Sequence, residues 1–473
     1  MNYSKPSAEM IEALQALLPG RVYTGDDIND DYTHDEMAYN GKYYPDLAVE
    51  VLTTQEVSEV CRLCYENNVP IVPRGAGTGL SGGCVPVAGG VIIDMSKMNQ
   101  ILSVDLDRMV IRVQAGALVE DVQKACDEID MMYAPDPGEK LATVGGNVAT
   151  NAGGMRACKY GTTRDHVRAM TVVMPNGDIM RMGAEVSKNC TGYSLMNLMS
   201  GSEGTLGIIT ELSMKIIAKP KVMISLLAPF EDLESCISCV SKIKAAGLDP
   251  QALEFMMRDN VADVEEFLGK KIYPDKIDGV DCGAYLLVTF DGPNEDILDE
   301  TLETAADLFM ENGALDVLIY DTADGFRNVW AVRGNVLEAL LANFKQQEET
   351  DVVVPIPNIA EFVAYAVSLE DELEFKVRAT GHAGDGNVHI NVCANDMDED
   401  KFVNNVAIFM DKVYEKGIEL GGLISGEHGI GSAKMKYLAR NLGEEQVALM
   451  KAIKQACDPK MLLNPGKVCF FIQ

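Results

Sequence analysis

Short apolar runs alternate with longer amphipathic segments along the first part of the chain. Apolar residues recur at helical spacing over residues 8–18 and 55–68, which predicts two helices. Residues 46–52 and 69–73 form shorter apolar runs, which predict strands. The second of these strands leads directly into a glycine-rich loop over residues 74–83. This part of the chain is therefore predicted to present loops of small residues at the ends of strands.

After residue 220 the glycine-rich blocks stop, and short strands alternate with long helices. This pattern predicts an α+β domain with an antiparallel sheet. A chain of 473 residues is too long for one core, so two to three domains are expected. The predicted strands cover residues 222–228, 283–290, 315–320, 375–380, 387–392 and 423–424, and the predicted helices cover residues 231–246, 295–312, 360–372, 400–418 and 433–435.

The first glycine-rich loop has the spacing of a dinucleotide-binding motif, because residues 77–82 spell G-x-G-x-x-G after a strand. A Rossmann domain requires a helix to follow that loop. Residues 84–90 contain two glycines and a proline, which disfavour a helix, and residues 91–94 predict a strand. We therefore predict no Rossmann domain. The loop can still bind phosphate through backbone N–H groups and the hydroxyls of Thr78 and Ser81, although a turn without a ligand explains this loop alone equally well.

Three more glycine-rich blocks follow, at residues 135–154, 160–165 and 202–210. Together with the first loop they indicate several backbone segments arranged along one extended ligand. The alternative is that each block is only a tight turn, which requires four coincidences.

The charge balance narrows the possible partners. The chain has 40 Lys+Arg against 72 Asp+Glu, a formal net charge of −32, which disfavours nucleic acid and anionic membrane surfaces. The N-terminus lacks the basic and apolar regions of a signal peptide, and no apolar run approaches the roughly 20 residues that span a bilayer. We expect a soluble, cytoplasmic protein with no nucleic-acid partner and no membrane span.

The twelve cysteines are scattered, which predicts free thiols. Cys61/Cys64 and Cys236/Cys239 are C-x-x-C pairs within helical apolar patterns, so we interpret them as core positions rather than half of a metal site. The chain has no C-x-x-C-x-x-C run, and therefore we expect no iron–sulfur cluster of its own.

The histidines cluster although they are scarce. Of five in the chain, His382 and His389 flank a glycine-rich turn, and His428 follows Glu427 in a second glycine-rich segment. Two imidazoles and a carboxylate suit a divalent metal, which leaves one histidine for acid–base chemistry. Each histidine alone would more simply be a hydrogen-bonded structural residue, but the set favours function.

The strand pattern around these histidines predicts which side chains share a face. A period of two puts His389 and Asn391 on one face of the strand at residues 387–392, and Asn391 is included as a catalytic candidate. We place His382 in the loop between the two strands, where Asp385 braces the turn.

In their order and spacing, these motifs resemble the vanillyl-alcohol-oxidase/PCMH flavoprotein superfamily. Within it, the chain is similar to the FAD-linked D-lactate dehydrogenase and glycolate oxidase family over nearly its whole length. The resemblance implies an α+β fold, with a PCMH-type FAD-binding domain over residues 1–220 and a substrate cap with an antiparallel sheet over residues 221–420. It also implies that residues 421–473 return to complete the FAD domain and active site, and residues 463–467 match the family's C-terminal signature.

The resemblance also assigns the cofactor site, with the loop at residues 74–83 clasping the FAD pyrophosphate. Covalent members often carry a histidine where this chain has Ala76, so non-covalent FAD is expected. His166 is expected to be a satisfied surface or packing histidine and not a flavin linkage, and His34, which lies among acidic residues, is expected to be solvated. The cofactor-binding residues implied are Arg74, Gly75, Ala76, Gly77, Thr78, Gly79, Leu80, Ser81, Pro137, Thr143, Gly146, Asn147, Thr150, Asn151, Gly153, Gly154, Tyr160, Gly161, Glu203, Gly204, Ile208, Ile209 and Asn464.

In the same family, the residues matching His382, His389 and Glu427 bind a divalent metal, for which Fe, Zn and Mn are the candidates. His428 matches the catalytic base, and Arg333 matches the residue that binds the substrate carboxylate. A surface ion pair is the alternative for Arg333.

The implied function is FAD-dependent oxidation of a small D-2-hydroxy acid to the 2-oxo acid. The hydroxyglutarate branch has a lysine where this chain has Glu349, and a negative charge there disfavours a second substrate carboxylate. D-lactate is therefore the first candidate and glycolate the second. Electrons would pass to a separate protein, either an electron-transfer flavoprotein or an iron–sulfur subunit. The alternatives are a relative of alkylglycerone-phosphate synthase and a non-catalytic FAD-binding assembly subunit.

Overall fold

The computed structural model describes residues 2–37 and 41–472, and the chain forms two compact units. Unit 1 comprises residues 1–153, 161–219 and 427–473, and unit 2 comprises residues 154–160 and 220–426. The divisions at 219/220 and 426/427 fall beside the predicted boundaries at 220 and 420. The short segment at residues 154–160 was expected in the first domain, but it belongs to unit 2.

Unit 1 contains a four-stranded sheet in the order β1-β2-β4-β3, in which β2, β4 and β3 run parallel. The helix between β2 (Leu47–Glu50) and β3 (Ile71–Arg74) is α2 (Thr54–Asn67), which begins where the Thr53 side chain accepts a hydrogen bond from the Glu56 amide. Its buried residues include both cysteines of the first C-x-x-C pair, as predicted for a core position. The glycine-rich loop after β3 leads to the strand β4 (Val91–Asp94) and not to a helix, which confirms that the domain is not a Rossmann fold.

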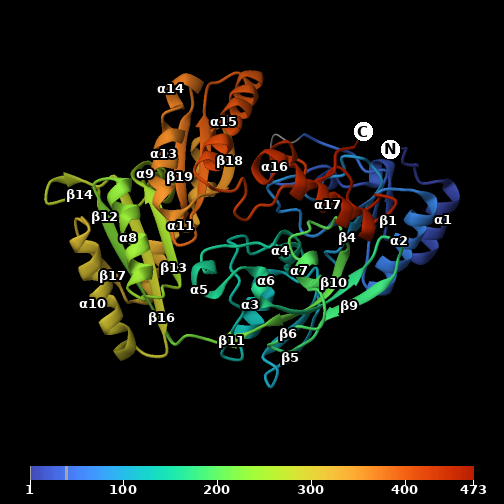
Figure 1. The fold of residues 1–473 in the computed structure, drawn as a ribbon, viewed down its shortest axis with the longest axis horizontal. Helices are drawn as coiled ribbons and strands as arrows, with labels where there is room; N and C mark the ends of the chain where they lie inside the picture. The colour runs from blue at the N-terminus through green and yellow to red at the C-terminus, as the bar shows by residue number, and fades with distance from the viewer. Residues whose placement is uncertain (1, 38–40, 473) are drawn as a thin grey trace. The chain divides into compact units, whose positions relative to one another are not determined.

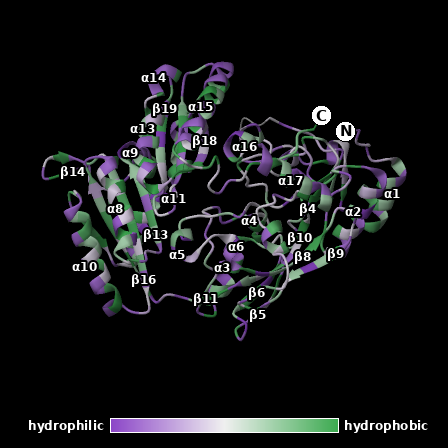
Figure 2. Ribbon diagram, in the orientation of Figure 1, coloured by the Kyte–Doolittle hydropathy of each residue, from purple (hydrophilic) through white to green (hydrophobic). Residues whose placement is uncertain are grey.

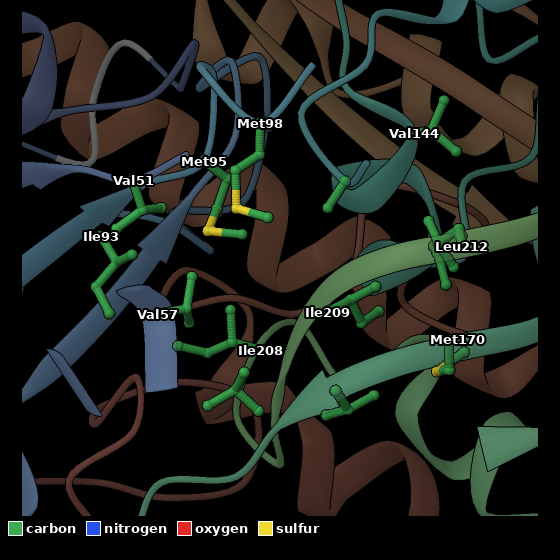
Figure 3. Close-up of a cluster of buried hydrophobic side chains, with 14 of the residues drawn as sticks. Val51, Val57, Ile93, Met95, Met98, Val144, Met170, Ile208, Ile209 and Leu212 are labelled. Carbon is green, nitrogen blue, oxygen red and sulfur yellow. The ribbon is translucent and has the colours of Figure 1, made fainter. Parts of the chain in front are cut away.

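A second, antiparallel sheet in unit 1 has the order β5-β6-β10-β8-β9. One apolar core joins both sheets of the unit, with Ile93 from the first sheet, Met170 and Leu212 from the second and Val57 from α2 (Figure 3). The remaining elements of unit 1 are β1 (Val22–Thr24), β5 (Ile101–Asp105), β6 (Val110–Gln114), β7 (Met131–Met132), β8 (Val167–Val173), β9 (Ile179–Gly183), β10 (Ile208–Lys215), β11 (Ile217–Ala218), α1 (Ala8–Leu17), α3 (Val119–Asp127), α4 (Val144–Thr150), α6 (Thr163–His166), α7 (Leu195–Met199), α16 (Met435–Leu442) and α17 (Glu444–Cys457).

Unit 2 is built on a seven-stranded sheet in the order β17-β12-β16-β13-β19-β20-β18, and every neighbouring pair is antiparallel, which confirms the predicted sheet (Figure 1). Two groups of helices pack against it. In the first group α8 contacts α10 and α13, and α13 contacts α15; in the second group α9, α11 and α12 contact one another. The strands are β12 (Val222–Phe230), β13 (Ala252–Met257), β16 (Ala284–Gly292), β17 (Leu318–Tyr320), β18 (Gln346–Val353), β19 (Lys376–His382) and β20 (Asn387–Ala394), with a small hairpin of β14 (Lys276–Ile277) and β15 (Val280–Asp281).

The helices of unit 2 are amphipathic, as their sequence pattern predicts. Figure 2 shows hydrophilic and hydrophobic residues alternating along α10, whose buried residues are Leu298, Leu302, Ala305 and Phe309. The helices are α5 (Ala157–Tyr160), α8 (Leu233–Ala245), α9 (Arg258–Leu268), α10 (Glu295–Glu311), α11 (Ala323–Gly334), α12 (Val336–Asn343), α13 (Ile359–Val367), α14 (Glu370–Leu373) and α15 (Glu399–Glu419). Among the described residues, no helix combines the length and the apolar character needed to cross a membrane.

Several predicted elements need correction. The helix expected over residues 360–372 is two helices, α13 and α14, and the strand expected over residues 315–320 is only β17. Leu423 forms an isolated bridge with Val353 instead of a strand. The second glycine-rich block was expected to be a loop, but α4 forms within it, beginning where the Thr143 side chain accepts from the Gly146 amide.

Candidate functional site

Unit 1 contains a cavity lined by three glycine-rich segments, at residues 73–84, 137–152 and 203–209. Glu427 and His428 also line it. The segments approach one another closely, since a Cβ added to Gly75 would lie 2.4 Å from Thr143 Oγ1. The lining is thus mostly backbone and small side chains, which suits an extended ligand that takes hydrogen bonds from amides.

The side-chain amide of Asn147 supplies an independent sign of a ligand in this cavity. Asn147 lines the cavity and is buried, and its Nδ2 atom has no hydrogen-bond partner within the part of the chain that the structure describes. A buried donor without a partner is costly, so a bound polar group would satisfy it. The residues present therefore fit a nucleotide cofactor such as FAD.

The loop that carries His428 is held by buried groups of unit 1. Glu203 accepts hydrogen bonds from the amides of Ile430 (2.8 Å) and Gly431 (2.7 Å), and Ser81 Oγ donates to the His428 carbonyl at 2.9 Å. Burial raises the pKa of Glu203, although the two amide donors oppose the rise. Glu203 was predicted to bind the cofactor, and its carboxylate braces the segment beside the cavity.

In unit 2, the two clustered histidines lie on central strands of the seven-stranded sheet. His382 is the last residue of β19, not part of a loop as predicted, and His389 lies on β20. Thr380 pairs with His389 across the two strands, so His382 and His389 project from the same face. Their ring centroids are 5.3 Å apart at an interplanar angle of 89°, and both residues are buried.

Each imidazole has a carboxylate beside its Nδ1 atom. His382 Nδ1 lies 2.8 Å from Glu254 Oε1, and His389 Nδ1 lies 3.0 Å from Glu349 Oε1. The contact of His382 is a hydrogen bond, whereas that of His389 is an ion-pair contact. A carboxylate hydrogen-bonded to one ring nitrogen is the usual surrounding of a metal-binding histidine, because it fixes the tautomer and directs Nε2 to the metal. The donor set therefore fits a divalent metal. Asn391 pairs with Glu349 in the β18–β20 register, and its Oδ1 atom is buried without a partner among the described residues.

Arg333 is placed on the same side of the sheet by α11, where Val329 and Val332 pack into the core. Its Nε atom donates to Glu254 Oε2 at 2.8 Å, and its side chain is 13% exposed. The ion pair between Arg333 and Glu254 is therefore buried, and it is not the surface ion pair that was the alternative for Arg333. Burial alone would raise the pKa of Glu254, but His382 and Arg333 together more than offset that effect, so the pKa is lowered.

Comparison with known proteins supplies the family. Residues 45–183 match the family described as FAD binding domain, and residues 219–468 match FAD linked oxidases, C-terminal domain. The chain belongs to the FAD-linked oxidase family. This confirms the family predicted from the motifs.

Individual relatives agree with this membership. The FAD-linked oxidase is 54% identical over 468 residues to D-lactate dehydrogenase of Anaerostipes hadrus, covering 99% of this chain and 98% of that relative. It is 37% identical over 425 residues to the glycolate oxidase subunit GlcD of Bacillus subtilis (strain 168), covering 90% of this chain and 89% of that one. The solved structure of p-cresol methylhydroxylase with substrate bound has a TM-score of 0.82 at 19% identity, covering 98% of this chain and 96% of that one, which shows a shared PCMH-type fold.

Most residues predicted to bind the cofactor line the cavity of this FAD-linked oxidase. Residues without a chemical signal also line it, such as Met95 and Ala115, while Gly83 and Gly145 could have been found from the glycine-rich blocks. The predicted residues that line the cavity are Arg74, Gly75, Ala76, Gly77, Thr78, Gly79, Leu80, Ser81, Pro137, Thr143, Gly146, Asn147, Thr150, Glu203, Gly204, Ile208 and Ile209.

Other predicted cofactor residues lie outside the cavity lining and have structural contacts instead. Asn464 Nδ2 donates to the carbonyls of Gly83 and Glu203, both at 2.8 Å, and so ties two lining segments together. Tyr160 belongs to unit 2 and donates to Asp291 at 2.5 Å. The residues outside the lining are Asn151, Gly153, Gly154, Tyr160, Gly161 and Asn464.

The two remaining histidines of the FAD-linked oxidase, His166 and His34, belong to unit 1. His166 is buried and packs edge-on against Tyr133, as expected for a packing residue. His34 was predicted to be solvated, but it is half-buried, and its carbonyl accepts a hydrogen bond from Arg74 Nη1 at 2.8 Å. The backbone at His34 therefore helps to fix the first cavity loop.

Proposed function

We propose that the enzyme oxidises a small D-2-hydroxy acid to the 2-oxo acid, with D-lactate as the first candidate and glycolate as the second. The observation that carries this proposal is the pair of buried imidazoles, each with a carboxylate at Nδ1, on one sheet face beside Arg333. The names of the relatives, D-lactate dehydrogenase and glycolate oxidase subunit GlcD, support the substrate class.

The proposed metal ligands in unit 2 are the Nε2 atoms of His382 and His389. Glu427 is the third ligand that the family resemblance assigns, and Fe, Zn and Mn remain the candidates for the cation. When bound, such a cation would lower the pKa of the substrate hydroxyl as a Lewis acid.

The chain's own groups would then bind the substrate and move its proton. Arg333 holds the substrate carboxylate through its two terminal nitrogens, since its Nε is engaged by Glu254. His428, which lines the FAD cavity, accepts the hydroxyl proton as a general base. Asn391 donates or accepts a hydrogen bond at the substrate through its buried amide. FAD, when bound non-covalently in the cavity, would supply the acceptor for the hydride that leaves the substrate's α-carbon.

A monocarboxylate remains the proposed substrate, but the reason changes. The negative charge of Glu349 was expected to disfavour a second substrate carboxylate. Its carboxylate lies 3.0 Å from His389 Nδ1, and its side chain is 15% exposed. The carboxylate of Glu349 lies beside His389, at the position where the hydroxyglutarate branch has a lysine. This chain therefore offers no cation at that position to pair with a second substrate carboxylate.

The reduced flavin is proposed to pass its electrons to a separate protein, either an electron-transfer flavoprotein or an iron–sulfur subunit. The relative named as a glycolate oxidase subunit supports an assembly of this kind. We propose that both proteins work in the cytoplasm.

Anaerobic stopped-flow absorbance tests the proposed function directly. Purified holoenzyme is mixed with D-lactate, L-lactate, glycolate and D-2-hydroxyglutarate, and bleaching of the oxidised flavin band is followed. We expect D-lactate to reduce the flavin fastest and L-lactate to leave it oxidised. Equal rates with both lactate enantiomers would contradict the proposed stereochemistry.

The same experiment separates the alternatives. A non-catalytic assembly subunit would bind FAD but show no bleaching with any hydroxy acid. A relative of alkylglycerone-phosphate synthase would also fail with hydroxy acids, and would instead turn over an acylated dihydroxyacetone phosphate.

A further inference from the structure

Glu254 is the only charged residue of strand β13, and it is fully buried. Its neighbours Leu253, Phe255 and Met256 are apolar and buried as well. A carboxylate in such a position is costly unless it is paired, and a paired charge can often be replaced by apolar residues without loss of stability. Packing alone therefore does not account for a glutamate here.

The two oxygens of Glu254 serve two different side chains. Oε1 lies 2.8 Å from His382 Nδ1, and Oε2 accepts from Arg333 Nε at 2.8 Å. Glu254 is also the register partner of His382 between β13 and β19, so the backbone fixes the carboxylate directly opposite the imidazole. Arg333 reaches the same carboxylate from α11. One rigid strand residue thus orients a proposed metal ligand and the proposed substrate anchor together.

We infer that Glu254 is a positioning residue that couples the tautomer of His382 to the orientation of Arg333. Because Glu254 Oε1 accepts a hydrogen bond from Nδ1 of His382, the imidazole proton is held on Nδ1, and Nε2 keeps the lone pair that a metal needs. The same carboxylate holds Nε of Arg333, which turns the two terminal nitrogens away from Glu254 and leaves them for a substrate carboxylate. This inference rests on the proposed function and adds a residue to it.

Glu254 needs both carboxylate oxygens, one for His382 and one for Arg333, so substitutions that remove one or both oxygens should have different effects. In Glu254→Gln one oxygen becomes an NH₂ group, so the side chain can accept from His382 or from Arg333 but not from both. Glu254→Ala removes both acceptors. Glu265→Gln is the matched control, because Glu265 is another buried glutamate of unit 2, bonded to Arg258 at 2.9 Å and to the backbone amides of Ile272 and Tyr273.

Two measurements on the FAD-loaded enzyme test the inference. The first is Zn²⁺ affinity of the chelator-treated enzyme, measured by competition with a chromophoric chelator. The second is the KM and kcat for D-lactate at saturating Zn²⁺, with an artificial electron acceptor. We expect Glu254→Ala to weaken Zn²⁺ binding by about 10- to 100-fold and also to raise the KM by about tenfold or more. Glu254→Gln should produce at least one of these changes, and Glu265→Gln neither.

The possible outcomes separate this inference from the proposed function. Wild-type Zn²⁺ affinity and KM in both folded Glu254 variants would overturn the inference alone. The same changes in Glu265→Gln would also overturn it, since they would then reflect general loosening of unit 2. If Glu254→Ala does not fold, Glu254→Gln decides both measurements. If the wild-type enzyme binds no Zn²⁺, Mn²⁺ or Fe²⁺, the proposed metal site and the proposed effect of Glu254 on His382 fail together. The KM of Glu254→Gln then decides whether Glu254 orients Arg333.

Discussion

The buried carboxylate of Asp351 accepts a hydrogen bond from Ser425 Oγ at 2.7 Å, and the amide of Gly426 lies 3.1 Å from both of its oxygens. Asn387 Nδ2 donates to the same carboxylate at 2.6 Å. Strand β18 therefore holds the end of the segment that immediately precedes Glu427 and His428 in the chain.

Replacing Asp351 by asparagine should slow substrate-driven flavin reduction by about 10- to 100-fold, because a small displacement of a catalytic group is costly in rate. One acceptor oxygen is lost and an NH₂ group faces a donor in its place. Stopped-flow reduction by D-lactate measures the effect, with FAD content as a check on folding. Asp396→Asn, whose aspartate is exposed and pairs with Lys345, is the control and should keep the wild-type rate. An unchanged rate in Asp351→Asn would show that this anchor does not matter for turnover.

His428→Ala should retain FAD yet lose reduction by D-lactate, by about 10²- to 10⁴-fold if the imidazole is the general base. Dithionite should still reduce the variant's flavin, which shows that the cofactor remains intact and accessible. Normal reduction by D-lactate in this variant would remove His428 from the proposed mechanism.

His382→Ala should lose bound metal and substrate oxidation together, because it removes one of the proposed nitrogen ligands. Metal per chain is measured by mass spectrometry after dialysis, alongside FAD content, which should not change. Metal content equal to that of the wild-type enzyme would refute the ligand role, whatever happens to the activity.

Lys467 provides a prediction about pH and stability. Burial lowers the pKa of Lys467 to about 8, and its ammonium donates to the Val85 carbonyl at 2.6 Å. The unfolded chain therefore binds more protons than the folded one between pH 8 and the usual lysine pKa, so this lysine makes the enzyme more stable as pH rises through that range. Its burial as a cation costs about 3 kcal/mol at lower pH.

Lys467→Met should consequently have a melting temperature above that of the wild type at pH 7.5, and the difference should shrink at pH 9.5. Differential scanning fluorimetry on both proteins at matched FAD concentration measures the two differences, and groups common to both proteins cancel. A difference that grows with pH would mean that the folded protein raises the pKa of Lys467 instead.

The sequence pattern predicted much of the fold because the signals are local. The helical spacing of apolar residues in α2 and α10 and the apolar runs of β12 and β16 mark elements that bury one face. The glycine-rich blocks likewise pointed to the cavity. Strand β18 was missed because its sequence, QQEETDVV, is polar even though half of it is buried. Helix α4 was missed because it contains two adjacent glycines, Gly145 and Gly146, which have low helix propensity.

The sequence predicted that His382 and His389 lie close together, but not which carboxylates lie beside them, because those neighbours depend on strand register. Glu254 gave no signal as a single carboxylate in an apolar run, and only the pairing of β13 with β19 places it beside His382. The predicted strand ended at residue 380, with His382 in a loop, but Gly381 and His382 both lie within β19. A Cβ at Gly381 would lie 2.2 Å from the Asn387 carbonyl oxygen and 2.8 Å from a ring carbon of Phe255, so the glycine lets the strand pack closely.

The contacts of Asn464 can form only after nearly the whole chain has been synthesised. Its side chain joins the carbonyls of Gly83 and Glu203, and Leu463 bridges to Ile71 beside it. All of unit 2 leaves the ribosome before these residues do. Unit 2 can therefore fold while unit 1 still lacks the end of its last segment, residues 427–473. We therefore expect FAD to be loaded late in biogenesis. A nascent chain stalled before residue 463 should carry a folded unit 2 and no flavin, which the absorbance of isolated stalled chains would measure.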